Sequence, residues 1–273
     1  MAVAGVDVGS RSVKLVILNE GRVIYSGVLV TEEEGGVAAR AMLDEALAVL
    51  KLRAEDIEFT VATGIGRDTV AFASRQRSEQ LCHARGAYWL FPLARTVLDV
   101  GAGGSRAMRL DGAGKVSDFS MNTKCASGTG AFLEDMTKIV DMPLEVMAEM
   151  AANAQGKARV SSFCAVFAES EVISNIHKGL PLDYIVAGIH EAVVDRLVEL
   201  LGRVHMAEEV VVTGGVARNR GVLKSLESRL GLKLRVPQEP ELTGALGAAL
   251  IAQDTVSRAR TAAKGQVPER ETV

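Results

Sequence analysis

Residues 3–18, VAGVDVGSRSVKLVIL, set an Asp-Val-Gly turn between two apolar runs that have the composition of β-strands. The same arrangement returns at residues 97–110, VLDVGAGGSRAMRL. In both stretches a basic residue follows the aspartate seven positions later, Lys14 after Asp7 and Arg106 after Asp99. Self-similarity of this kind indicates an internal duplication, so we expect two related lobes.

A second pair of segments supports the duplication. Residues 61–68, VATGIGRD, and 211–218, VVTGGVAR, are apolar runs that end in Thr-Gly. In α/β proteins such ends lie at the carboxyl edge of the sheet, where ligands bind. The first aspartate and threonine are 56 residues apart, and the second pair 114 apart. The second copy is therefore longer by roughly 58 residues.

These spacings predict an α/β protein with two duplicated lobes around a cleft. We expect the N-terminal lobe at residues 1–95 and the C-terminal lobe at 96–256. A helix-patterned insertion in the second lobe, at about residues 121–202, contains two of the three cysteines. Residues 257–273, SRARTAAKGQVPERETV, are charged and lack apolar periodicity, which predicts a flexible tail.

The composition excludes several classes of protein. Lys and Arg number 31 against 34 Asp and Glu, a net charge of −3, which argues against binding nucleic acid or an anionic membrane through bulk charge. No run approaches 18 apolar residues, so we expect no membrane span. Three cysteines without a preceding secretory signal indicate a cytoplasmic location.

The two Asp-Val-Gly turns carry the functional signal. Short side chains and backbone amides in such turns approach phosphates closely, and an aspartate holds Mg²⁺ or its waters. A single Asp-x-Gly-Ser is more often a simple hairpin turn. Two copies in register, joined by the Thr-Gly-Gly at 213–215 and a small-residue segment from Leu242, favour phosphate binding. The chain has neither a Walker lysine motif nor a Rossmann glycine motif after its first strand.

These motifs resemble, in type and order, the phosphate-one, phosphate-two and adenosine motifs of the actin, sugar-kinase and Hsp70 ATPase superfamily. The resemblance implies two actin-like (ribonuclease-H-like) lobes with ATP and Mg²⁺ in the cleft. It assigns the catalytic roles to Asp7 and Asp99. The expected ATP and Mg²⁺ contacts are Gly9, Ser10, Arg11, Ser12, Val13, Lys14, Gly101, Gly103, Gly104, Ser105, Gly128, Gly214, Gly215, Val216 and Glu241.

Two cysteines lie in the insertion, in residues 122–135, NTKCASGTGAFLED, and 161–174, SSFCAVFAESEVIS. Cys125 and Cys164 each precede a predicted helix, and the N-terminus of a helix stabilises an anion such as a thiolate. Two buried apolar cysteines are the plainer interpretation of either one alone. Three cysteines are too few for a four-thiolate site, but two chains that give two each would complete one.

Both segments resemble signature segments of the activators of 2-hydroxyacyl-CoA dehydratases and the ATP-binding subunits of benzoyl-CoA reductase. The match runs from Asp7 to about Gln253. It implies that Cys125 and Cys164 ligate a [4Fe-4S] cluster shared with a second copy or a related subunit. It also implies ATP-driven electron transfer from a ferredoxin or flavodoxin to an acyl-CoA or benzoyl-CoA partner with its own iron-sulfur cluster. Cys82 and His83 lie outside the segments and are interpreted as structural or near the nucleotide.

One departure from the family pattern is informative. Homodimeric activators usually carry Gln-Asp where this chain has Gly103 and Gly104, and often a glutamine at Glu241. The difference leans towards a heterodimeric benzoyl-CoA reductase subunit, with the homodimeric activator as the alternative, and leaves hydrolysis by this chain itself open. A sugar kinase and a nucleotide-gated scaffold without iron are the alternatives of other classes.

Overall fold

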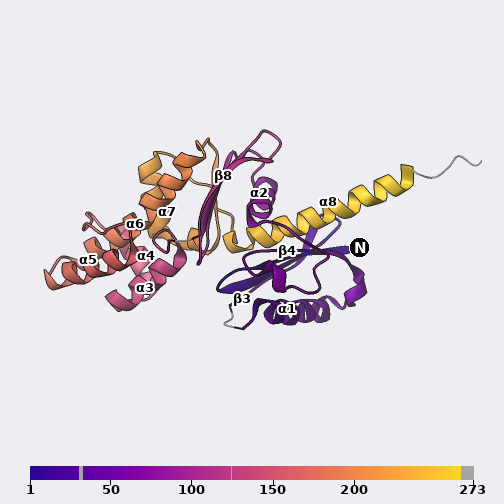
Figure 1. Ribbon diagram of the computed structural model, residues 1–273, viewed down its shortest axis with the longest axis horizontal. Helices are drawn as coiled ribbons and strands as arrows, with labels where there is room; N and C mark the ends of the chain where they lie inside the picture. Colours follow the sequence, from indigo (N-terminus) through magenta and orange to yellow (C-terminus); the bar gives the residue numbers. More distant parts are fainter. Residues whose placement is uncertain (31–32, 124, 266–273) are drawn as a thin grey trace, which may run out of the picture.

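The computed structural model describes residues 1–30, 33–123 and 125–265 of the chain. Two α/β lobes lie side by side, with the first strands and helix α1 in one lobe and the remaining strands with the helical insertion in the other (Figure 1). The predicted fold class is confirmed, including the duplication.

The N-terminal lobe is built on a five-stranded sheet of order β3-β2-β1-β4-β5. Its first three strands form an antiparallel meander, while β4 and β5 run parallel to β1 and β4 respectively. The strand bounds are β1 (Ala2–Val8), β2 (Ser12–Asn19), β3 (Arg22–Val30), β4 (Ile57–Thr63) and β5 (Arg75–Gln76).

The C-terminal lobe repeats this plan in a four-stranded sheet of order β8-β7-β6-β9. Again the first three strands are antiparallel, and β9 is parallel to β6. The registers coincide: Lys14 and Thr63 pair with Asp7 as Arg106 and Thr213 pair with Asp99. The strand bounds are β6 (Thr96–Val100), β7 (Ser105–Leu110), β8 (Val116–Asn122) and β9 (Val210–Thr213).

The second lobe differs from the first by added helices. Along the chain, helix α6 lies between β8 and β9, the third and fourth strands of the second lobe. Helix α1 (Gly35–Leu50) has the same place between β3 and β4 in the first lobe. Between the third and fourth strands in chain order, the second lobe therefore adds α3 to α5, a shorter stretch than the insertion at about residues 121–202 predicted from spacing. The helix bounds are α3 (Gly130–Val140), α4 (Leu144–Asn153), α5 (Ala165–His177), α6 (Leu182–Arg203) and α7 (Arg220–Leu230).

Strand alternation decides which way each aspartate faces. In β1, Ala4, Val6 and Val8 pack against α1, whereas Val3 packs against α8 (Thr243–Gly265), so Asp7 lies on the α8 face. In β6, Leu98 and Val100 join the core of the helical insertion, and the opposite face lies towards α2 (Glu79–Leu90). Both aspartates consequently face the layer between the two sheets.

Helices α2 and α8 form that layer, and each packs on the sheet of the other half of the chain. Helix α8 covers β1, β2 and β4, while α2 contacts strands β6 to β9. Three glycines permit the close approach, because a Cβ at Gly5, Gly86 or Gly247 would overlap backbone atoms of the neighbouring element. The packing of α2 and α8 therefore crosses the predicted division at residues 95/96, because each helix covers the sheet of the other half of the chain.

The end of the chain also differs from the prediction. Helix α8 continues to Gly265 and forms a long arm in Figure 1, so residues 257–265 are helical where a flexible tail was predicted. The remainder of that predicted tail, residues 266–273, lies outside the described residues. Across the helices that the structure describes, none has both the length and the apolar character needed to cross a membrane.

Candidate functional site

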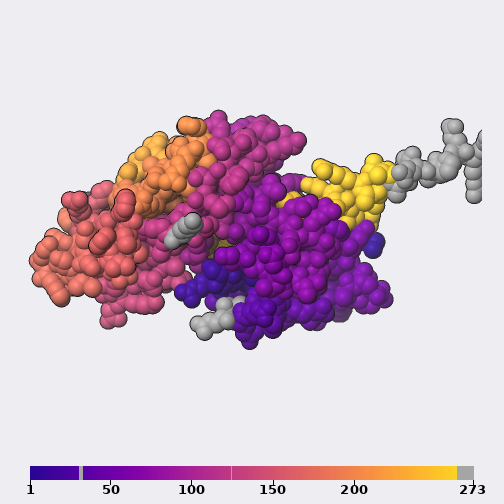
Figure 2. All heavy atoms as spheres, in the orientation of Figure 1, coloured from indigo at the N-terminus to yellow at the C-terminus, as the bar shows by residue number. Residues whose placement is uncertain are grey.

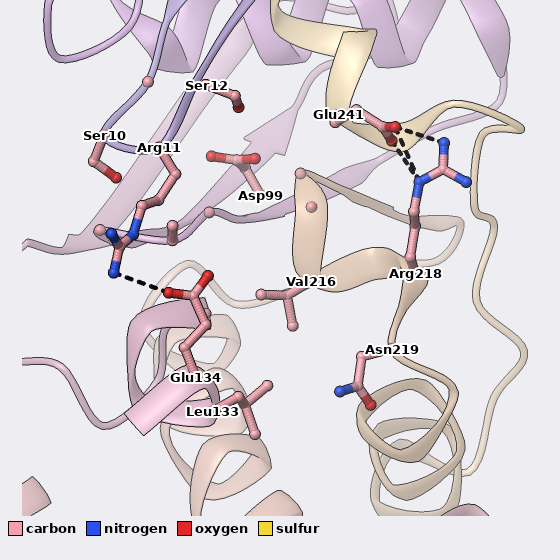
Figure 3. Close-up of a pocket in the computed structure, with 18 of the residues that line it drawn as sticks. Ser10, Arg11, Ser12, Asp99, Leu133, Glu134, Val216, Arg218, Asn219 and Glu241 are labelled. Atoms are coloured by element: carbon pink, nitrogen blue, oxygen red, sulfur yellow. Dashed lines mark hydrogen bonds and ion pairs between the residues drawn. The ribbon is translucent and has the colours of Figure 1, made fainter. Parts of the chain in front are cut away.

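A cavity of about 390 Å³ lies between the lobes, with both Asp-Val-Gly turns at its wall (Figure 3). Seen as filled atoms, the two lobes meet along a broad seam and the helical insertion extends beyond the N-terminal lobe (Figure 2). Most of the residues expected to contact ATP line the cavity, together with the two aspartates that were given catalytic roles. They are Asp7, Gly9, Ser10, Arg11, Ser12, Lys14, Asp99, Gly101, Gly103, Gly104, Gly214, Gly215, Val216 and Glu241.

Three of the expected contacts do not line the cavity. Val13 alternates inward from β2 into the core beneath α1. Ser105 is buried at the start of β7. Gly128 faces α6, since a Cβ there would lie 2.9 Å from the Cβ of Arg196. These three residues lie away from the cavity, because the spacing along a glycine-rich loop does not reveal which side of the loop a residue occupies.

The first turn leaves its aspartate open. The backbone N–H of Gly9 donates to the carbonyl oxygen of Ser12 at 3.0 Å, and Lys14 Nζ donates to the same oxygen at 3.3 Å. Asp7 is only 5% exposed, yet its carboxylate accepts no hydrogen bond from any described residue. A buried carboxylate that faces a cavity without a donor has the chemistry of a ligand for Mg²⁺ or its waters.

The second turn engages its aspartate fully. Arg106 Nη1 donates to Asp99 Oδ2 at 3.0 Å, and Thr213 Oγ1 and His83 Nδ1 each lie 3.4 Å from Oδ1. Arg106 Nη2 also donates to Glu79 Oε2 at 2.6 Å. Burial raises the pKa of Glu79 and Arg106 opposes that rise. Asp99 thus belongs to a buried network that reaches α2.

Glu79 was not predicted as a site residue from the sequence, and Arg106 was recognised only as a basic residue in the repeat. Both line the cavity, as does His83, which was expected to be structural or near the nucleotide. The repeat itself held the signal for Arg106, because a residue seven positions after each aspartate pairs with it across a hairpin. Nothing in the sequence places α2, and therefore Glu79, beside that hairpin.

Glycines permit close packing at two places, beside each of the two aspartates and between the two glycine turns. Gly64 and Gly214 have φ of 92° and 85°, and a Cβ on either would lie 2.6 Å from the Oδ1 of the aspartate beside it. Gly103 lies across the cleft from Ser10, whose Oγ would be 2.9 Å from a Cβ at position 103. The absence of a side chain at Gly103 thus allows the two phosphate-type turns to approach each other.

The opposite end of the cavity is more apolar. Leu133, Leu144 and Ala148 of the insertion line it together with Val216 of the 3-10 turn Gly215–Arg218. Beside them, Arg218 Nε donates to both carboxylate oxygens of Glu241 at 3.0 Å (Figure 3). The base of a nucleotide, with its flat apolar faces and polar edge, fits this end of the cavity. The phosphates of a nucleotide fit the end with the glycine turns.

The cysteine segments lie in the second lobe, near helices α5 and α6. Cys125 is partly buried, with its Sγ 2.9 Å from Ser127 Oγ, and Asn122 holds its backbone through hydrogen bonds to both N–H and C=O. Helix α3 begins at Gly130 with Thr129 as its N-cap, so Cys125 lies in the preceding loop rather than at the helix start. Cys164 is the N-cap residue of α5, as expected.

One hydrogen bond joins the two segments, and a second, from α6, binds the same carbonyl oxygen. Ser127 Oγ donates to the carbonyl oxygen of Ser162 at 3.0 Å, and Arg196 Nε donates to the same oxygen at 2.6 Å. Over the residues that the structure describes, no group of three or more His, Cys, Asp or Glu side chains is arranged to hold a metal ion. The two segments of one chain contain two thiols, half of what a four-thiolate cluster would require.

The third cysteine has a different environment. Cys82 is fully buried against α8, and burial raises its pKa to about 12. A thiol must be deprotonated to ligate iron, so this environment does not suit a ligand.

Comparisons with known proteins agree on one family. A profile of the BadF/BadG/BcrA/BcrD ATPase family matches residues 4–252. The activator of lactoyl-CoA dehydratase from Anaerotignum propionicum is 43% identical over 94% of this chain and all of its own length. One of the subunits of benzoyl-CoA reductase from Thauera aromatica is 36% identical over 90% of this chain and 91% of its own.

Solved structures give the same picture. The activator of 2-hydroxyisocaproyl-CoA dehydratase from Clostridium difficile, with bound ADPNP, superposes over the whole of both chains with a TM-score of 0.89 at 37% identity. A ROK hexokinase from Thermus thermophilus matches with a TM-score of 0.51 at 16% identity, covering 94% of this chain and all of its own, a likeness of fold alone.

Proposed function

The chain belongs to the BadF/BadG/BcrA/BcrD ATPase family, and from that premise we propose that it is an ATP-dependent electron carrier for a dehydratase or reductase. In this proposal Cys125 and Cys164 of two chains together hold one [4Fe-4S] cluster. The observation that carries the proposal is the hydrogen bond from Ser127 to Ser162, which joins the two cysteine segments in a chain that offers two thiols there; Arg196 of α6 donates to the same Ser162 carbonyl.

The surface beside Cys164 supports a second chain at the same place. Phe163 is 79% exposed, and Val166 and Phe167 on the first turn of α5 are each 64% exposed. Large apolar side chains next to a two-thiol donor set favour burial against another protein surface. A second copy, or a related subunit, would cover them and bring the other two thiols.

The nucleotide end of the mechanism rests on this chain's own residues. The glycine turns bind phosphates, Lys14 and Arg11 neutralise phosphate charge, and Asp7 holds Mg²⁺ or its waters. Asp99 fixes Arg106 and Glu79 between the lobes, so that the turn keeps its position against α2. When bound, the cluster would supply one low-potential electron, taken from a ferredoxin or flavodoxin and passed to the partner enzyme.

Two assemblies remain as candidates. Gly103 and Gly104 favour a heterodimeric reductase-type subunit, whereas the higher identity to a dehydratase activator, 43% against 36% to the reductase subunit, favours a homodimeric activator. A Cβ at position 103 would lie 2.9 Å from Ser10 Oγ, which gives the glycine a packing role that does not depend on the assembly.

The deciding experiment is anaerobic purification with iron and sulfide measured per chain. About two irons per chain, lost in Cys125→Ala and in Cys164→Ala, are expected for one cluster between two chains. Cys82→Ala is the matched control and should retain the iron, because Cys82 is buried away from the cysteine segments.

The assembly follows from where the iron is found. Iron in the chain expressed alone supports the homodimer, and iron only after co-expression with a related ATP-binding subunit supports the heterodimer. A chain that binds ATP without iron in either case would contradict the proposal and favour the sugar-kinase or scaffold alternative.

A further inference from the structure

One ion pair spans the mouth of the cavity. Arg11 Nη2 lies 3.0 Å from Glu134 Oε2, and Figure 3 shows the two side chains reaching towards each other. Arg11 belongs to the β1–β2 turn of the first lobe, and Glu134 to α3 of the second. Within the described residues neither side chain has another ionic partner. The pair is therefore a direct charge contact between the two lobes.

The pair is weak enough to be exchanged. The side chains are 55% and 39% exposed, and ion pairs in water-accessible positions contribute little to stability. Arg11 also lines the cavity beside Ser10, Ser12 and Lys14. A nucleotide phosphate bound there offers Arg11 several oxygens and more than one negative charge, which makes it a stronger partner than one carboxylate.

Helix α3 connects this pair to the cysteine segment. The N–H groups of Gly130 and Ala131, at its start, donate to the carbonyl oxygens of Gly101 and Ala102 in the second glycine turn. Thr129 Oγ1 donates to the carbonyl oxygen of Ala126, one residue after Cys125. A force on Glu134 thus acts on a helix that is tied at its start to the phosphate turn and to the Cys125 loop.

We propose that Glu134 is a positioning residue that holds Arg11 across the cavity mouth until a nucleotide phosphate takes its place. Nucleotide binding moves Arg11 from Glu134 to the phosphate and frees α3 from the first lobe. This inference rests on the proposed nucleotide-binding function and adds to it a specific contact through which the second lobe senses the nucleotide.

A double-mutant cycle tests the proposal with MgADPNP as the probe. The dissociation constant is measured by anaerobic calorimetry for the purified wild-type chain, Glu134→Gln, Arg11→Gln and the double variant. Glu134→Gln removes the competitor for Arg11 and should tighten binding about two- to fivefold, the range expected for an exposed ion pair. In the Arg11→Gln background the same change should retain only the general effect of removing one negative charge.

Glu145→Gln is the matched control. Glu145 lines the same cavity from α4 and forms no ion pair with any described residue, so its neutralisation reports the general effect of removing a negative charge near a polyanion. That general effect should be the same with and without Arg11. The Glu134 effect should also shrink in high salt, which screens an exposed pair.

The outcomes distinguish the role of Glu134 from nucleotide binding itself. If the wild type binds MgADPNP but Glu134→Gln leaves the affinity unchanged, weakens it, or tightens it equally in the Arg11→Gln background, the role of Glu134 is overturned and nucleotide binding stands. If the wild type binds no nucleotide, the proposed function fails, and the inference fails with it.

Discussion

The two lobes present the same turn in two chemical settings. Each has an aspartate at the end of its first strand, a basic residue opposite it on the second strand, and a Thr-Gly at the end of a parallel strand. In the first lobe the basic residue leaves the aspartate open to the cavity, whereas in the second it binds the aspartate and a glutamate together. A duplicated backbone therefore carries two different functions.

The difference comes from the chemistry of the two cations. Lys14 presents one compact ammonium group, which lies against the Ser12 carbonyl of its own turn. Arg106 presents a planar fork whose two terminal nitrogens reach Asp99 and Glu79 separately. The fork couples β6 to α2, the helix between the two sheets, and the ammonium leaves Asp7 free for a cation.

The largest expected effect is on stability. Arg106→Met leaves Asp99 and Glu79 buried without their shared partner, and breaking a buried ion pair in this way costs about 3–5 kcal/mol. Lys14→Met removes no such partner and should change the free energy of unfolding by less than about 1 kcal/mol. Chemical denaturation of both variants provides the measurement. Equal losses would show that the two turns are not differentiated in this way.

The next effect concerns the metal. Asp7→Asn should lower the Mg²⁺-dependent part of ADPNP affinity by at least about 10- to 100-fold, because it weakens the only open carboxylate of the pair. Asp99→Asn should leave the Mg²⁺ dependence in place and instead lower the unfolding temperature, since it loosens the Arg106 network. Titration of Mg²⁺ at fixed ADPNP distinguishes them, and a greater loss in Asp99→Asn would reverse the assignment.

The two turns also show how much of the structure can be predicted from the sequence alone. The repeated spacing of seven residues between an aspartate and a basic residue predicted both hairpins, because these two residues pair directly across neighbouring strands. The Thr-Gly strand ends were predicted from the same internal duplication. The resemblance of two segments to family signatures singled out Cys125 and Cys164 as cluster ligands, and this role stays a prediction. The sequence predicted neither Glu79 nor the Arg11–Glu134 pair, because each joins elements whose relative position depends on packing between distant parts of the chain.

The packing of α2 and α8, each on the sheet of the other half of the chain, was also not predicted from the sequence. Gly5, Gly86 and Gly247 permit that packing, but isolated glycines in strands and helices have no periodic signature. Continuation of α8 through residues 257–265 was missed for a related reason: its exposed end has no apolar stripe to detect, and a charged segment with several alanines still has good helix propensity.

The smallest expected effect is a pH dependence at the second turn, where Arg106 binds Glu79 of α2, a carboxyl group whose pKa burial raises. A raised pKa in the folded state means that the folded protein favours the protonated form, so this contribution to stability is full below the unfolded pKa. It is lost as pH rises through the folded value. Glu79→Gln, which does not titrate, should therefore become more stable relative to the wild type between acidic and neutral pH.

Unfolding free energies of both proteins across that interval provide the test, with Glu134→Gln as a control on an exposed glutamate. The expected difference is small, because Arg106 counteracts the burial of Glu79 in the ionised state. A difference of the opposite sign would mean that attraction to Arg106 outweighs burial and that Glu79 is held ionised. In that case the second turn would carry a permanent ion pair across α2, and the contrast with the open carboxylate of Asp7 would be greater still.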